Sequence, residues 1–181
     1  MQYFIGIVPS DEYKQKVTAF QQKWKNHWIT DVVEPHITVK AQGGLTPDKE
    51  WIRKVKKVCN QFSPFNISVS KPMFFGEDIL YLSVNSKELY ELHNKIVEKI
   101  LPSDDLIKKY FELDDYIPHM TLGKTYFGLS KQDLNDMAKL AEEELTPYPT
   151  FEVNFIRIYQ EVEPLKYVKL LDIPLSNVNF N

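Results

Sequence analysis

Apolar residues recur every second residue in some segments and every third or fourth residue in others. Each change of spacing marks a new structural element. Residues 2–8 are apolar and β-prone and end at Pro9, which predicts a buried strand. Beyond Ser10 the spacing lengthens, which predicts an amphipathic helix with an apolar face made of Tyr13, Val17, Phe20 and Trp24. After Pro35 the spacing returns to two, as in a strand.

The next segment is expected to form a helix, a hairpin and another helix. Thr46 as N-cap and Pro47 at the first helical position predict a helix start. The apolar stripe of this helix comprises Trp51, Val55, Val58, Cys59 and Phe62. Two strand-like runs follow at about 65–74 and 79–85 and indicate a hairpin, and a further helix is expected over 87–101.

The remainder of the chain follows the same plan. A strand is expected at 119–123, and the spacing of Ser130 to Asp133 resembles a capping box at the start of a helix. Two closing strands are expected at about 151–160 and 165–173.

The order of helix, Pro-His-x-Thr strand, helix and hairpin therefore occurs twice. We predict a single bilobal domain over residues 1–181, with repeat halves at roughly 10–85 and 86–175. The expected fold is α+β, with two pseudo-symmetric lobes around a central cleft. Each lobe would be an antiparallel sheet backed by helices.

Composition restricts the classes of function. A formal net charge of -3 and a pI of about 5.8 argue against a protein that coats long nucleic acid, although they allow a small phosphate pocket. The single cysteine, Cys59, excludes an internal disulfide. The N-terminus does not resemble a signal peptide, and no apolar run approaches 18 residues. We therefore expect a cytoplasmic monomer without membrane association.

Two short motifs carry the candidate chemistry, one from Pro35 to Val39 and the other from Pro118 to Leu122. Each has the pattern Pro-His-x-Thr followed by an aliphatic residue. Residues i and i+2 of a strand point to the same face, so each motif projects a histidine and a threonine side by side. The sets are His36 with Thr38, and His119 with Thr121.

Two histidines and two threonines suit the cleavage of a phosphodiester. The reaction requires an activated water and a protonated leaving oxygen, and histidine can fill both roles because its unperturbed pKa is about 6.5. We expect His36 and His119 to be the catalytic pair. Thr38 and Thr121 would bind phosphate oxygens, whose charge grows in the transition state.

Two lysines just beyond the motifs are candidate phosphate ligands. On a regular strand Lys40 lies on the face of His36, whereas Lys124 reaches the face of His119 only if Gly123 alters the register. Solvent-exposed lysines are an equally good interpretation of both.

The doubled His-x-Thr motif resembles the two-histidine (2H) phosphoesterase superfamily, which includes bacterial 2′-5′ RNA ligase-like proteins and 2′,3′-cyclic nucleotide phosphodiesterases. Motif spacing, element order and length all fit, except that Val39 stands where leucine is usual. The resemblance implies a bilobal fold and metal-independent hydrolysis of cyclic or 2′-linked phosphodiesters. It also implies catalytic roles for His36, Thr38, His119 and Thr121, with a nucleotide or RNA end as substrate and no cofactor.

Other side chains offer weaker alternatives. Five aromatic residues could stack on a base, although strand aromatics usually belong to the core: Tyr3, Phe74, Phe75, Tyr126 and Phe127. His27 is expected to cap a helix C-terminus, and His93 to be half-exposed. A metal site is disfavoured because neither motif brings a carboxylate to the same strand face.

Three other functions remain open. A nucleotide-binding or RNA-end-binding module with little catalysis would not need two titratable groups. RNA ligation would use the same site in the reverse direction. A scaffold protein has no specific signal in the sequence.

Overall fold

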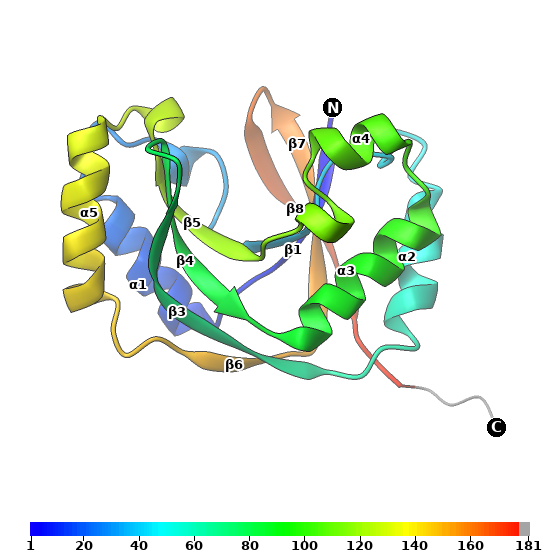
Figure 1. Ribbon diagram of the computed structural model, residues 1–181. Helices are drawn as coiled ribbons and strands as arrows, with labels where there is room; N and C mark the ends of the chain where they lie inside the picture. The colour runs from blue at the N-terminus through cyan, green and yellow to red at the C-terminus, as the bar shows by residue number, and fades with distance from the viewer. Residues whose placement is uncertain (178–181) are drawn as a thin grey trace.

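The computed structural model describes residues 1–177, in which eight strands form one antiparallel sheet (Figure 1). Their order across the sheet is β6-β3-β4-β5-β2-β1-β7-β8. The strands are β1 (Tyr3–Ile7), β2 (Ile37–Lys40), β3 (Phe65–Phe75), β4 (Ile79–Asn85), β5 (His119–Lys124), β6 (Thr150–Val153), β7 (Phe155–Glu163) and β8 (Lys166–Pro174).

Helices pack at both ends of this sheet. The α-helices are α1 (Asp11–Gln21), α2 (Trp51–Cys59), α3 (Lys87–Ile100), α4 (Asp104–Lys109) and α5 (Lys131–Glu144), and the short 3-10 helices are η1 (Ile29–Asp31), η2 (Leu113–Asp115) and η3 (Thr125–Phe127). Helices α1 and α5 pack on the strands around β5, and we call this part the α5 lobe. Helices α2 and α3 pack on the side of β2 and β8, which we call the α3 lobe (Figure 1). Over residues 1–177, none of these helices combines the length and apolarity needed to cross a membrane.

The α+β prediction is confirmed, and the two lobes are halves of one continuous sheet. They join where β2 pairs with β5. The predicted strand at 151–160 is in fact two strands, because the chain changes lobes at Asn154. Strand β6 pairs with β3 on one side of that residue, and β7 pairs with β1 on the other. The predicted internal repeat stays a prediction.

Serine caps the start of α1, α3, α4 and α5, and of the two caps predicted from the sequence, at Thr46 and Ser130, one is confirmed. Ser130 and Asp133 form the predicted capping box, in which each side chain accepts a hydrogen bond from the other residue's backbone N–H. The predicted start at Thr46 is wrong, since α2 begins at Trp51. Lys49 has a φ of 61°, and this left-handed residue separates the turn after Thr46 from the helix. Helix α4, capped by Ser103, was not predicted.

A β-bulge in β2 removes Lys40 from the face expected for it. Ile5 pairs with Lys40 and Gly6 with Thr38, so Val39 is an extra residue. Thr38 and Lys40 therefore point to opposite faces. The Lys40 side chain is 0% exposed, and its ammonium donates to the carboxylate of Glu112 at 2.7 Å. The prediction that Lys40 binds phosphate is wrong, because its charge is buried and already paired.

A matching bulge in β5 has the reverse effect on Lys124. Tyr81 pairs with Thr121 and Ile79 pairs with Lys124, which leaves Leu122 as the extra residue. Tyr81 and Ile79 lie on one face of β4, so Thr121 and Lys124 share a face as well. The altered register near Gly123 therefore brings Lys124 onto the face of the second motif.

Side chains from α1, from α3 and from the segment after η2 satisfy the carbonyl groups at both bulges. In β2, the Thr38 carbonyl accepts from the Tyr116 hydroxyl at 2.8 Å, and the Val39 carbonyl accepts from Nδ1 of His93 at 2.6 Å. In β5, the Gln21 amide on α1 donates to the carbonyls of Thr121 and Leu122 at 3.3 and 3.2 Å. These bonds stabilise the irregular backbone that places the motif side chains.

The remaining two histidines are buried, so both predictions about them are wrong. His93 is 1% exposed and stacks on Tyr116 with ring centroids 3.8 Å apart. Its Nε2 accepts from the backbone N–H of Leu113 at 2.9 Å. Burial lowers the pKa of His93 to about 4. Burial also lowers the pKa of His27, which lies beyond the end of α1 and is not a cap charge.

Replacing Gly123 by alanine should destabilise the α5 lobe. A Cβ at this position would lie 2.7 Å from Cδ1 of Leu129 and 2.9 Å from Sδ of Met137. We expect the free energy of unfolding to fall by about 1–3 kcal/mol, the usual cost of overpacking a core. Denaturant unfolding measures this, with Asn66→Ala on an exposed position of β3 as the control. A Gly123→Ala protein as stable as this control would contradict the close packing.

Replacing Lys40 by methionine should unfold the protein more easily, because Glu112 would keep a buried carboxylate without its cation. The expected loss in the free energy of unfolding is roughly 3–5 kcal/mol. The double variant Lys40→Met/Glu112→Leu removes both charges and should recover most of the loss. If Lys40→Met instead kept full stability but lost phosphate affinity, the original phosphate-binding role would be restored.

Acid should weaken the fold through His93. Its pKa is about 4 in the folded protein, against about 6.5 in an unfolded chain, so the unfolded state binds the proton first. This contribution to stability is complete above pH 6.5 and is lost as the pH falls towards 4. Between pH 7 and 4.5, His93→Gln should lose roughly 2 kcal/mol less than the parent protein. Equal losses in denaturant unfolding at both pH values would contradict the assignment.

Candidate active site

The two motifs meet at the junction of the lobes, where their central residues pair across β2 and β5. Ile37 lies opposite Met120 in this antiparallel pair, and both side chains are fully buried in the core. Because side chains alternate along a strand, the residues on either side of each central position project from the other face of the sheet. These four side chains, all half-buried, are His36, Thr38, His119 and Thr121.

The same register sets how the four side chains stand to one another. In an antiparallel pair centred on Ile37 and Met120, His36 lies opposite Thr121 and His119 lies opposite Thr38. The two histidines are then diagonal neighbours, which in such ladders are about 7–8 Å apart. A phosphate group fits between side chains at this separation, so the register of the two strands agrees with the expected convergence of the motifs.

Both histidine rings are oriented by the same hydrogen bond. Nδ1 of His36 lies 2.8 Å from the carbonyl of Glu34, and Nδ1 of His119 lies 2.7 Å from the carbonyl of Ile117. A carbonyl oxygen only accepts hydrogen bonds, so the proton of each neutral ring is on Nδ1. Each Nε2 therefore carries a lone pair that can accept a proton.

Aromatic rings pack against each histidine. The ring centroid of His36 is 4.8 Å from Phe4 and 5.6 Å from Tyr159. That of His119 is 5.0 Å from Phe75 and 5.3 Å from Tyr81. These apolar surroundings lock the imidazoles in place and withdraw them from water.

The electrostatics of the site keep both imidazoles neutral at pH 7. The pKa of His36 is lowered to about 4, mainly by burial and also by His119 and Lys124, while the hydrogen bond to the Glu34 carbonyl opposes this shift. Burial and the nearby Lys124 also lower the pKa of His119. The pKa of Lys124 is itself lowered by burial. Among residues 1–177, no carboxylate forms an ion pair with Lys124, so its ammonium is available to an anion.

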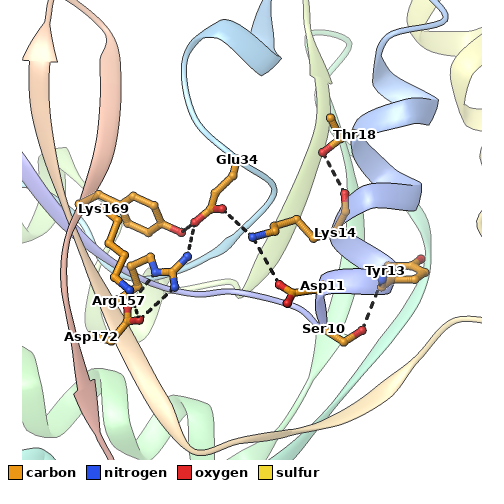
Figure 2. A network of polar contacts seen from close by, with 10 residues as sticks. Ser10, Asp11, Tyr13, Lys14, Thr18, Glu34, Arg157, Lys169 and Asp172 are labelled. Carbon is orange, nitrogen blue, oxygen red and sulfur yellow. Dashed lines mark hydrogen bonds and ion pairs between the residues drawn. The ribbon is translucent and has the colours of Figure 1, made fainter.

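The backbone before His36 is held by a polar network centred on Glu34 (Figure 2). The Glu34 carboxylate accepts from Lys14 at 2.9 Å, from Arg157 at 2.6 Å and from the Tyr159 hydroxyl at 2.9 Å. Arg157 also binds Asp172 through two nitrogens. Burial alone would raise the pKa of Glu34, but these hydrogen bonds outweigh it and the pKa is lowered. Glu34 therefore stays ionised and fixes the carbonyl that orients His36.

A cavity of about 530 Å³ opens beside the second motif. Thr38, His119 and Lys124 line one part of it, whereas His36 and Thr121 lie on the same sheet face outside its lining. Most of the other lining residues are aromatic or aliphatic, and they come from the end of β2, from β3 and β4, and from the segment after α4. Within the described residues 1–177, no group of three or more histidine, cysteine or acidic side chains is placed to hold a metal ion.

The aromatic candidates fall into different places. Tyr3 is part of the core, the more usual place for a strand aromatic, so it offers no surface for stacking. Phe75 lines the cavity and packs on His119, whereas Tyr126 is exposed on η3. Phe111, which is 70% exposed at the cavity, was not among the residues predicted from the sequence. No local pattern pointed to it, because its exposure depends on a left-handed backbone after a helix that was not predicted.

Comparison with known proteins identifies the family. The model of the 2′-5′ RNA ligase superfamily matches residues 9–161 of this chain. An RNA 2′,3′-cyclic phosphodiesterase of Methanocaldococcus jannaschii is 25% identical over 166 residues, which cover 88% of this chain and 91% of that protein. Both descriptions support a phosphoesterase, and hence hydrolase activity in general.

Solved structures share the fold at low sequence identity. The protein TT0787 of Thermus thermophilus superposes with a TM-score of 0.68 and 14% identity, covering 99% of this chain and 100% of that chain. E. coli LigT complexed with 3′-AMP gives a TM-score of 0.61 and 13% identity, covering 97% and 98%. Together with the family match and the two His-x-Thr strands, these results show that the chain belongs to the 2′-5′ RNA ligase superfamily, the two-histidine phosphoesterases that its sequence resembles.

Proposed function

We propose that this protein is a metal-independent phosphodiesterase that uses His36 and His119 as an acid–base pair. Its substrate would be a 2′,3′-cyclic phosphate or a 2′-5′ linkage at a nucleotide or RNA end. The observation that carries this proposal is the pairing of the two motif strands at Ile37 and Met120, which turns both histidines to one face. The Nδ1 atoms of both rings are engaged by carbonyls, so each Nε2 can accept or deliver a proton there.

For a cyclic phosphate, hydrolysis needs one proton removed and one supplied. One histidine takes a proton from water through Nε2, and the water oxygen forms a bond to phosphorus. The bond from phosphorus to the 2′ or 3′ oxygen breaks, and the other histidine, protonated, donates its proton to that oxygen. The product is a phosphomonoester beside a free hydroxyl. General acid–base assistance of this kind contributes about 10²–10⁴-fold for each transfer.

The lowered pKa values of both histidines agree with this cycle. In the free protein the rings are neutral, so one is ready to act as a base. A bound phosphodiester is an anion, and a nearby negative charge raises the pKa of an imidazole. Substrate binding therefore favours protonation of the second ring.

Thr38, Thr121 and Lys124 would bind the phosphate. The threonine hydroxyls share the face of the histidines and can donate to the non-bridging oxygens. Lys124 supplies the positive charge, since the bulge in β5 brings it to the same face as Thr121. With Lys40 paired to Glu112, the site depends on one lysine rather than two.

The relatives support a nucleotide substrate. The M. jannaschii relative is described as acting on RNA 2′,3′-cyclic phosphate, and E. coli LigT has been crystallised with 3′-AMP and with phosphate. A net charge of -3 favours recognition of the terminal phosphate over a long strand. Ligation would use the same acid–base pair with a 5′-hydroxyl in place of water: one histidine takes the hydroxyl proton, the oxygen bonds to phosphorus, and the bond from phosphorus to the 3′ oxygen breaks as the other histidine protonates that oxygen, which leaves a 2′-5′ linkage. We propose a monomer that works in the cytoplasm without a cofactor.

Replacing either His36 or His119 by alanine should lower kcat for adenosine 2′,3′-cyclic phosphate by about 10²–10⁴-fold. The double variant should cost less than the product of the single effects, because the two residues act on one transition state. Steady-state kinetics measures this, and circular dichroism checks that each variant is folded.

A chelator series is the matching control for metal dependence. Activity should be unchanged by EDTA, since the proposed acid and base are both side chains. Loss of activity on chelation, with recovery on adding metal back, would contradict the metal-independent mechanism. Full activity of either alanine variant would contradict the role of that histidine.

A further inference from the structure

Phe111 occupies a backbone position that normally belongs to glycine. It follows α4 with a φ of 53°, in the left-handed region. Its N–H donates to the Lys108 carbonyl at 3.3 Å, and the N–H of Glu112 donates to the Ile107 carbonyl at 3.1 Å. These two bonds define a Schellman helix end, in which the left-handed residue is usually glycine because a Cβ is strained there.

The side chain of Phe111 contributes little packing that would offset this backbone strain. It is 70% exposed, so most of the phenyl ring remains in water. A bulky residue at positive φ is uncommon, and such outliers gather at ligand-binding sites. Leu101, at the end of α3, also combines a positive φ with high exposure, but it does not line the cavity. The position of Phe111 at the cavity, together with its exposed ring, therefore indicates a contact with something other than the protein itself.

The segment that carries Phe111 is fixed to the site by its neighbours. Glu112 is paired with the buried Lys40. The N–H of Leu113 donates to Nε2 of His93, and the Tyr116 hydroxyl donates to the Thr38 carbonyl. Phe111 is therefore presented by a braced segment whose bonds lead directly to the first catalytic strand.

The cavity beside this segment has positive charge, as an anion requires, only where Lys124 lines it. Lys124, His119 and Thr38 lie among its lining residues, and Lys124 is the one lysine or arginine among the described residues that line it. Phe75 and Ile79 contribute to its apolar walls. The exposed Asp115 also lines the cavity, and its carboxylate disfavours a second phosphate there. A ligand with one anionic group and one uncharged apolar group matches this distribution.

We propose that the cavity holds the base of the nucleoside whose phosphate reacts, with Phe111 as the ring on which that base stacks. The inference rests on the proposed function and adds the position of the base and the substrate class. The preferred substrate is a nucleoside with a single phosphate at its reacting end. The volume of about 530 Å³ lies within the range typical of small-molecule sites and suits one nucleoside.

A second aromatic cluster offers a rival platform for the base. The ring of Tyr126, which is 66% exposed, has its centroid 6.2 Å from that of Trp28. Phe127 packs on Trp28 with ring centroids 4.8 Å apart, and the ammonium of Lys124 lies 5.8 Å from the centroid of Phe127. None of these three residues lines the cavity that contains Thr38 and His119. The geometry therefore favours Phe111, and Tyr126 supplies a matched control because it is an aromatic residue of similar exposure.

The test compares two cyclic phosphodiesters, adenosine 2′,3′-cyclic phosphate and glycerol 1,2-cyclic phosphate, which has no base. Phe111→Ala should raise KM for the adenosine substrate about 10-fold, the scale of one lost base stack, while kcat changes less than twofold. It should leave the glycerol substrate unaffected. Phe111→Tyr should restore the KM, and Tyr126→Ala should behave as the parent protein. A KM increase caused by Tyr126→Ala and not by Phe111→Ala would overturn the proposal.

A binding measurement separates this inference from the proposed reaction. Calorimetry with adenosine 3′-monophosphate and with inorganic phosphate needs no turnover. Phe111→Ala and Phe111→Gly should weaken the nucleotide about 10-fold and leave phosphate unchanged, whether or not the protein hydrolyses any cyclic phosphate. Phe111→Gly should also raise Tm by about 2–4 °C, because it relieves the left-handed strain. Equal nucleotide affinity in the parent and both variants would refute the stacking role.

Discussion

The structure depends on one contact, the antiparallel pairing of β2 and β5 at Ile37 and Met120. This pair closes the eight-stranded sheet across the two lobes and buries both central side chains in the core. Because side chains alternate between the two faces of a strand, the residues next to Ile37 and Met120 all project from the opposite face. A single strand pairing thus joins the lobes and brings the two halves of the site together.

Both motif strands contain a β-bulge stabilised by side chains from elsewhere in the chain, but the two bulges have opposite effects on the neighbouring lysines. Each motif strand bulges one residue after its threonine, and a helix from the other half of the sequence bonds the irregular carbonyls through Gln21 or His93. Lys40 leaves the site at the first bulge, and Lys124 joins it at the second. The site therefore has one cationic side, and the Glu34 network orders the histidine on the other side.

The elements and the four central side chains of the site could be predicted because they depend on local periodicity. A spacing of two residues fixes which side chains share a strand face, and this was sufficient for His36, Thr38, His119 and Thr121. The fate of Lys40 could not be predicted in this way, since the bulge at Val39 is decided by pairing with β1, far away in the sequence. Phe111 was missed for a related reason, because a left-handed phenylalanine contradicts the local preference that such analysis uses.

The change of lobes at Asn154 has a consequence for how the chain can be divided. The α5 lobe takes the hairpin β3–β4 from the first half of the sequence and β5 with α5 from the second, whereas the α3 lobe takes α2 from the first half and α3, β7 and β8 from the second. Each lobe is thus built from elements of both halves of the sequence. We therefore expect that neither half folds on its own, and that fragments made by a cut between β4 and α3 acquire structure only when they recombine. Because these interlaced contacts join distant residues, folding is expected to be slow for a chain of this size, and the sheet face that carries both histidines is complete only when both halves are present.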